Sequence, residues 1–243
     1  MYKRQISKSA TKFSNFLLDK NLGNVQTIDV EFREYWGGIF AAHPWLDGPS
    51  DSYLGFWQRG GGACGEHSHA INLWQNFASA SEVGRIIEVN ANMEYINDNK
   101  IDYDSLCLMH VKTESGLIGR IVQDVITQPT RKWARVQSEN GFVEWFCGNK
   151  PGVDTVICGK NDTKTETFEI YKTRPDDFYE EMKHIDFVSN NKESDYIHSP
   201  ISLKKGLETM LVISAAHLSA QNNCAVSIDY SLGYEENALS LIK

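Results

Sequence analysis

The chain has 243 residues, of which 41% are hydrophobic, so it is long and apolar enough to bury a substantial core. Its 32 acidic and 24 basic side chains give a net charge of −8, and Lys and Arg nowhere form the cluster that a nucleic-acid surface needs. The longest apolar runs are far below the roughly 18 residues of a membrane span, and no signal peptide, repeat or linker is recognisable, which predicts a single domain over residues 1–243. Five widely spaced cysteines, an odd number, predict a reducing cytoplasm and no disulfide framework.

The first predicted elements are a helix and a strand. Apolar side chains at helical spacing predict a helix over residues 9–20 that ends before Gly23. Alternating apolar and polar residues predict a strand over 27–33 with one covered face. The segment 35–59 is long and rich in aromatic residues, which is typical of a functional loop, although a loop that merely packs over a sheet edge is an alternative.

A run of three glycines (60–62) opens the most informative segment, because glycines let the backbone approach a ligand closely. Glu66, His69 and Asn72 follow at i, i+3 and i+6, so one continuous helix running to about residue 78 would present them along one side, with His67 facing elsewhere. A carboxylate beside an imidazole can relay a proton to or from a substrate hydroxyl. An alternative is that the acid caps the helix and the second histidine is a core residue.

Two other interpretations of this segment are weaker. Gly60-x-Gly62-x-x-Gly65 matches a dinucleotide fingerprint, but no buried parallel strand precedes it, so no cofactor-binding residue is assigned. A cupin-like metal site is the other possibility, but the expected downstream glutamate is missing and a helix cannot direct its two histidines at one ion. No metal ligand is therefore assigned among the available donors, which are Cys64, Glu66, His67 and His69.

The remainder of the chain is predicted to be rich in strands. Short turns between successive strands indicate antiparallel pairing. Clustered strands with separate helices predict an α+β architecture with the helices on one face of the sheet. The predicted strands cover 87–95, 105–113, 117–127, 132–138, 141–147, 165–172 and 225–229, and the predicted helices cover 176–188 and 203–221, the last capped by Ser202.

The glycine run followed by Glu66, His69 and Asn72 resembles the signature of the substrate domain of the Gfo/Idh/MocA family of NAD(P)-dependent sugar and cyclitol oxidoreductases. The chain departs from that signature twice, with Glu66 in place of the usual Asp and Asn72 in place of a later Asp. The spacing of three residues resembles members associated with nonulosonate or nucleotide-sugar metabolism. Further segments that resemble the family lie at 21–25, 43–45, 51–53, 124–131, 139–145 and 206–229.

The resemblance implies a large mixed, mostly antiparallel sheet whose free face packs against another subunit in a homo-oligomer. It also implies NAD or NADP, bound mainly by a Rossmann domain that is absent from this chain, as is the family's Glu-Lys-Pro motif. The chain is then either a standalone substrate domain with a separate partner or an amino-terminally truncated enzyme. We expect truncation and interpret residues 1–5 as sequence foreign to the gene.

In chemical terms the resemblance implies hydride transfer from a sugar, cyclitol or nucleotide-sugar hydroxyl. His69 would take the hydroxyl proton while Glu66 orients the imidazole or relays the proton, or the two roles are exchanged. Proposed substrate contacts are Asn72, the aromatic faces of Trp45 and Tyr53, and Arg131, for which a structural role is an equal alternative. Other functions left open are a non-catalytic carbohydrate-binding or oligomerisation module and a cupin-like metal-binding domain.

Overall fold

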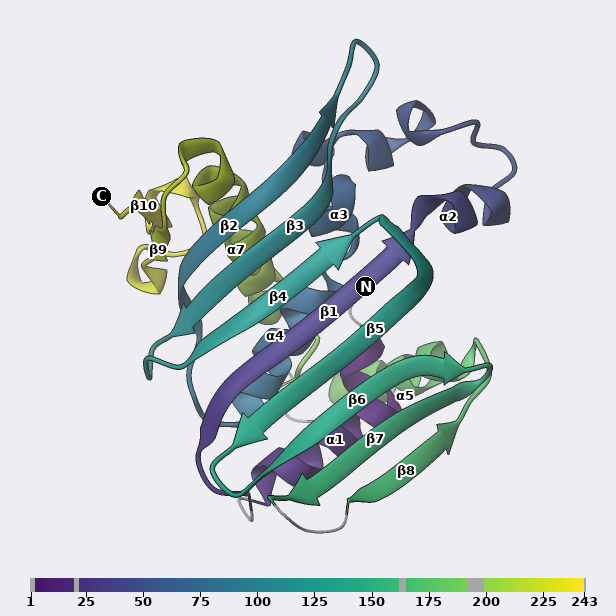
Figure 1. Ribbon diagram of the computed structural model, residues 1–243, viewed down its shortest axis with the longest axis vertical. Coiled ribbons are helices and arrows are strands. Elements are labelled where there is room, and N and C mark those ends of the chain that lie inside the picture. The colour runs from purple at the N-terminus through teal and green to yellow at the C-terminus, as the bar shows by residue number, and fades with distance from the viewer. Residues whose placement is uncertain (1–2, 20–21, 162–164, 192–198, 243) are drawn as a thin grey trace.

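The computed structural model describes residues 3–19, 22–161, 165–191 and 199–242. These residues form one ten-stranded sheet, in the order β10-β9-β2-β3-β4-β1-β5-β6-β7-β8 (Figure 1). The strands are β1 (Val25–Tyr35), β2 (Ile86–Asn97), β3 (Asp102–Thr113), β4 (Ile118–Asp124), β5 (Ile126–Ser138), β6 (Gly141–Lys150), β7 (Val153–Lys160), β8 (Glu166–Tyr171), β9 (Val226–Ile228) and β10 (Leu239–Leu241). The longer helices are α1 (Lys8–Leu18), α4 (His69–Ala80), α5 (Asp176–Asn190) and α7 (Leu203–Asn222).

The sheet is mixed and mostly antiparallel, as predicted. β1 lies at its centre and pairs in parallel with β4, where Asp29 is opposite Arg120, while its pairing with β5 and all other pairings are antiparallel. The longer helices lie together behind the sheet in Figure 1, and the other face carries no helix of the described chain. Ile28, Val30 and Phe32 are fully buried beneath the helices, so the alternate side chains of β1 point to the open face.

Several elements differ from the prediction. The segment 35–59 is not an irregular loop, because it contains α2 (Trp36–Ala42) and three short 3₁₀ helices (49–51, 53–55 and 57–59). The predicted site helix is two helices, α3 (Gly62–Glu66) and α4, separated by two turn residues. β7 and β10 were not predicted. The alternation of apolar and polar residues does not reveal β7, because this strand contains a fully buried acid, Asp154. Asp154 forms an ion pair with Lys172 at 2.7 Å.

Part of the segment interpreted as foreign sequence is packed into the domain. A 3₁₀ helix spans Lys3–Ile6 and contacts α4 and α5. Gln5 is only 5% exposed. Residues 1 and 2 lie outside the described residues. Within the described part of the chain, no helix is long and apolar enough to cross a bilayer.

Candidate active site

The glycine run forms a tight turn that leads from a 3₁₀ helix (Trp57–Arg59) into α3. Gly60 and Gly62 have φ angles of +87° and +76°, a region that residues with a Cβ adopt only under strain. Gly62 also packs against a carboxylate, because a Cβ at this position would lie 1.9 Å from Oδ1 of Asp104. The element that leads directly into the glycines is this 3₁₀ helix rather than a strand, so the geometry gives no support to the dinucleotide fingerprint.

Two buried polar side chains from the sheet hold this turn in place. Asp104 of β3 accepts a hydrogen bond from the backbone N–H of Cys64 at 2.7 Å, so it caps the first turn of α3 from outside the helix. Gln123 of β4 donates from Nε2 to the carbonyl oxygens of Ala63 and Cys64, at 2.8 and 3.1 Å. Burial raises the pKa of Asp104 to about 7. The turn is thus fixed by a carboxyl that titrates near neutral pH.

A register shift explains why the sequence pattern did not reveal Asp104. Along β3, Cys107 and Met109 are buried among the helices, and strict alternation would place Ser105 with them and Asp104 on the open face. Leu106 is opposite Glu94 but Asp104 is opposite Tyr95, so one extra residue is inserted between the two pairs. This bulge brings Asp104 to the helix side of the sheet.

Glu66 ends α3 and is joined to the aromatic segment. Its Oε2 accepts a hydrogen bond of 2.6 Å from the hydroxyl of Tyr53. Burial raises the pKa of Glu66, the Tyr53 hydroxyl lowers it, and the charge of Glu34 raises it again. Burial, the hydrogen bond to Glu66 and the charge of Glu66 raise the pKa of Tyr53 to about 12. The pair is therefore a phenol that keeps its proton and a carboxyl that is easier to protonate than a free one.

His69 begins α4, on the helix side of β1. Its ring centroid lies 6.4 Å from that of Phe32, whose ring stacks on Trp145. The Nζ of Lys132 lies 5.9 Å from the centroid of Phe32 and forms an ion pair with Glu34. His69 and the Lys132–Glu34 ion pair thus lie near the end of β1, and the charge of Glu34 acts on Glu66 of α3.

The turn between α3 and α4 changes the expected side-by-side arrangement. His67 is the C-cap residue that follows α3, and its backbone (φ −95°, ψ 22°) departs from helical values. Glu66 and His69 therefore belong to two helices rather than to one continuous helix face. His67 is 3% exposed and so is placed in the interior, away from the surface on which Tyr53 lies.

Two other predicted substrate contacts, Trp45 and Asn72, occupy different positions. Trp45 is 74% exposed and lies edge-on to His43, with the ring centroids 5.1 Å apart, so it is open to a ligand. Asn72 is only 2% exposed, and its Nδ2 donates a hydrogen bond to Thr209 of α7 at 3.1 Å. This contact joins two helices behind the sheet.

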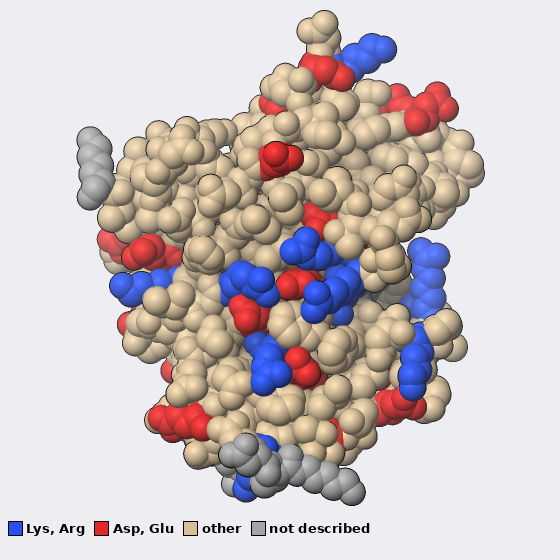
Figure 2. All heavy atoms as spheres, viewed as in Figure 1, with Lys and Arg blue, Asp and Glu red and all other residues tan. Residues whose placement is uncertain are grey.

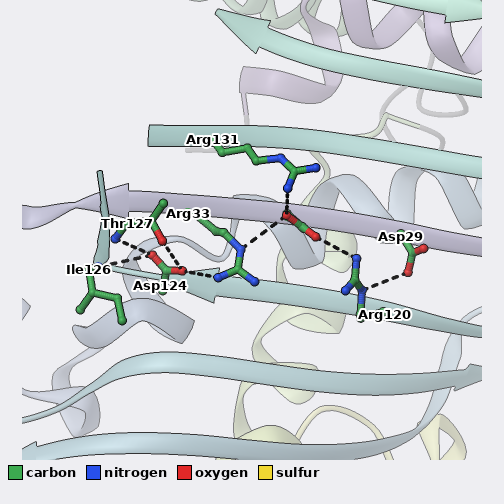
Figure 3. A network of polar contacts seen from close by, with 8 residues as sticks. Asp29, Arg33, Arg120, Asp124, Ile126, Thr127 and Arg131 are labelled. Carbon is green, nitrogen blue, oxygen red and sulfur yellow. Dashed lines mark hydrogen bonds and ion pairs between the residues drawn. The ribbon is translucent and has the colours of Figure 1, made fainter. Parts of the chain in front are cut away.

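Arg131 belongs to a network on the open face of the sheet. Acidic and basic side chains gather at the centre of this face (Figure 2). Glu31, whose side chain is 5% exposed, is in contact with Arg33 at 3.4 Å, Arg120 at 2.8 Å and Arg131 at 3.2 Å (Figure 3). Arg33 also pairs with Asp124 at 2.9 Å. Because Phe32 and His69 lie on the helix side, the sheet separates Arg131 from the candidate site, which favours its structural role.

The possible metal donors do not converge. A hydrogen bond with Cys107 and burial raise the pKa of Cys64, which is fully buried, while Glu66 is hydrogen-bonded to Tyr53. Among the described residues, no group of three or more His, Cys, Asp or Glu side chains is placed to hold an ion. The geometry therefore gives no support to the cupin-like alternative.

Comparison with known proteins places this geometry in a wider context. No protein-family model matches the sequence, and no curated protein matches it significantly. Solved structures do match. An NAD-binding oxidoreductase from Klebsiella pneumoniae aligns with a TM-score of 0.74 and 15% identity over 93% of this chain and 65% of that one. An aldose-aldose oxidoreductase from Caulobacter crescentus, complexed with glycerol, gives 0.72 and 15% over 93% and 62%.

A homologue of inositol dehydrogenase from Azotobacter vinelandii, complexed with NAD+, gives a TM-score of 0.71 at 12% identity, over 93% of this chain and 64% of that one. The chain thus spans less than two thirds of the length of these similar structures. Its fold is that of the corresponding part of Gfo/Idh/MocA-type NAD-binding oxidoreductases. This confirms, at the level of the fold, the resemblance found in the sequence.

Proposed function

We propose that this chain is the substrate-binding half of a nicotinamide-dependent oxidoreductase that acts on a hydroxyl of a sugar, cyclitol or nucleotide sugar. The observation that carries the proposal is the Tyr53–Glu66 hydrogen bond of 2.6 Å at the end of the glycine-run helix, with His69 opening the next helix. The names of similar structures agree with this substrate class, since one is an inositol dehydrogenase homologue complexed with NADH and myo-inositol.

In this proposal the chain handles the substrate and its proton. His69 takes the proton of the substrate hydroxyl, and Glu66 receives or returns it, since burial raises the pKa of Glu66 toward the range in which a carboxyl can exchange protons. Tyr53 holds Glu66 in place, and its own raised pKa keeps it a hydrogen-bond donor. Nicotinamide, when bound, supplies the hydride acceptor. The nucleotide is held mainly by a Rossmann domain, on the same polypeptide or on a partner.

The aromatic segment provides the remaining contacts with the substrate. Trp45 and Tyr53 are exposed on it, and aromatic faces suit the C–H face of a sugar ring. Asn72 is buried against Thr209, so within this proposal it supports the site helix from behind. A second copy of the chain covers the open face of the sheet, where Ile118 is 62% exposed beside the charged network.

Binding of a polyol to the chain tests the proposal. Titration with myo-inositol, followed by ¹H–¹³C NMR of the aromatic and histidine rings, is expected to shift the signals of Tyr53 and His69. Glu66→Gln is expected to weaken this binding, while the matched change Glu235→Gln, at an exposed position far along the chain, leaves it unchanged. Shifts confined to other rings, or equal affinity in both variants, would contradict the assigned site. Light scattering of the same samples measures whether a dimer forms.

Catalysis separates the proposal from a non-catalytic carbohydrate-binding module. Joined to a Rossmann domain from a similar oxidoreductase, the chain is expected to reduce NAD+ or NADP+ with a bound polyol. Polyol binding without turnover, in a fusion shown to bind NAD+, would instead support the binding module.

A further inference from the structure

Helix α5 differs from an ordinary surface helix in the side on which it carries its apolar residues. Phe178, Met182 and Ile185 recur at i, i+4 and i+7, so they form one stripe along the helix. The exposed fractions of these three side chains are 41%, 58% and 38%. The buried residue of α5 is instead an acid, Glu181. The described part of the domain therefore leaves this α5 stripe largely open.

Polar side chains attach α5 to its own domain. Asp177 forms an ion pair with Lys172 at 2.8 Å, and Nε2 of His184 lies 2.7 Å from Oγ of Ser199. These contacts lie on the sides of the helix away from the stripe, so burial of the stripe is not what holds α5 in place. A contiguous row of exposed apolar side chains is typical of an interaction surface.

The amino-terminal end of the described chain contacts the same helix. The 3₁₀ helix Lys3–Ile6 packs against α5, at the end of the domain that carries β6, β7 and β8 (Figure 1). A helix with its side chains is about 10–12 Å across and an extended residue spans about 3.4 Å, so roughly five residues pass around half of its circumference. A segment that precedes Lys3 can thus reach the stripe within a few residues.

The similar solved structures indicate what such a segment carries. This chain covers 65% of the Klebsiella pneumoniae oxidoreductase and 64% of the Azotobacter vinelandii homologue, so more than a third of each protein lies outside the match. The matched part corresponds to the carboxy-terminal domain of such oxidoreductases. A nucleotide-binding domain ahead of the corresponding region would therefore enter this fold beside α5.

The size of the α5 stripe argues against a second copy of the chain as its occupant. The exposed parts of the three side chains together amount to less than the surface of two whole side chains. A stable interface between separate proteins buries about 800 Å2 on each partner, which the stripe cannot supply. A domain joined by a short linker needs less surface, because the linker keeps its effective concentration near the millimolar range.

We propose that the α5 stripe is the docking surface for the nucleotide-binding domain, which is joined to the chain ahead of Lys3; this rests on the proposed function for the existence of that domain. The domain meets the stripe with apolar side chains of its own, and Met182 lies beneath it.

Oxidation of Met182 tests the proposal, because a docked domain shields its thioether from peroxide. The 243-residue chain and its amino-terminal fusion to a Rossmann domain from a similar oxidoreductase are treated with hydrogen peroxide, with N-acetylmethionine as an internal standard. Mass spectrometry then measures the sulfoxide at Met182. The rate in the fusion is expected to be at least about fivefold lower, as when the domain is docked for at least about four fifths of the time.

Equal rates in the chain and the fusion would overturn the proposal, whether or not the fusion turns over a polyol. Turnover is measured on the same fusion and tests the proposed function separately, so shielding of Met182 without turnover supports the docking surface alone. Shielding in the unfused chain that increases with its concentration would assign the stripe to a second copy and would refute the proposal.

Two matched variants locate the contact on one side of α5. Ile185 and Phe187 are both apolar and exposed, but they lie roughly 160° apart around the helix axis. In the fusion, Ile185→Asp is expected to restore the Met182 oxidation rate of the unfused chain, whereas Phe187→Asp leaves it low. Shielding that survives Ile185→Asp would place the contact elsewhere and refute the assignment.

The unfused chain shows whether Ile185→Asp damages the helix itself. Its circular dichroism and its Met182 oxidation rate are expected to match those of the parent chain. If they do not, Ile185→Ala, which introduces no charge, replaces it in the fusion and is expected to raise the oxidation rate of Met182 there, and an unchanged rate would contradict the docking surface.

Discussion

Replacement of Asp104 by Asn should flatten the pH dependence of stability, because this buried carboxyl is the group that couples the glycine turn to pH. Its pKa rises from the ordinary value of 3.8 to about 7 in the folded chain, chiefly through burial. One pKa unit is worth about 1.36 kcal/mol, so the shift corresponds to about 4 kcal/mol. Since the folded pKa is the higher one, the stabilisation by the protonated form is complete below about pH 3.8. This stabilisation is lost progressively above that pH, and the loss is complete once the pH has risen through the folded pKa of about 7.

Asn is almost the same size and keeps an oxygen that can accept the Cys64 N–H bond, but it does not titrate. The difference in unfolding free energy, Asp104→Asn minus parent, should therefore grow with pH by about 4 kcal/mol in total. More than half of this growth is expected between pH 5 and pH 8. A constant offset, for example from the new amide N–H near Gly62, does not change the slope.

Urea unfolding at half-unit intervals from pH 5 to pH 8.5, followed by circular dichroism, measures this difference. Glu235→Gln at an exposed position is the control and should give a difference that is flat with pH. A flat difference for Asp104→Asn as well would show that the carboxyl titrates normally, and the reasoning from burial would be wrong.

Three further outcomes are expected. Tyr53→Phe removes the hydrogen bond that lowers the pKa of Glu66, so this pKa should rise further in a ¹³C NMR titration of the carboxyl, and a fall would contradict the pairing. Gly62→Ala should lower the unfolding free energy by about 2 kcal/mol or more, because of its positive φ and the contact with Asp104, whereas Gly38→Ala, with open space around it, should not. In the fusion with a Rossmann domain, His69→Ala should lower kcat by roughly 10²–10⁴ at an unchanged unfolding midpoint, and undiminished turnover would leave this residue structural.

Much of the fold follows from local pattern. Strict alternation identifies β1 and β2, and the Ser202 side chain that accepts from the N–H of Lys205 caps α7 where the sequence predicts it. The architecture follows because the strands are grouped along the chain and joined by short turns. Local pattern does not identify a strand that contains a buried charge. In β7 the buried Asp154 is paired with Lys172, which lies outside the strand, so the pairing cannot be read from the sequence of β7 itself.

The candidate site was less predictable for two physical reasons. The prediction that Glu66 and His69 lie side by side assumed one unbroken helix. The residue types at 67–68 do not indicate the turn that separates these two residues. The face on which a strand residue lies depends on register, which a single inserted residue inverts. Asp104 reaches the glycine turn through such a bulge, and Arg131 could be assigned to the open face only after its partner Glu31 was seen.

The central position of β1 imposes an order of assembly on the chain. Both of its neighbours come much later in the sequence: Asp29 is opposite Arg120 on one side and Arg135 on the other. The hairpin of β2 and β3 can form from local contacts, but β1 has no partner until β4 and β5 are available, and closing so long a loop is slow. During synthesis the first strand must therefore wait for a strand partner until about residue 124, the end of β4, has left the ribosome, and until then only helices that precede β4, such as α4, can cover its apolar side chains.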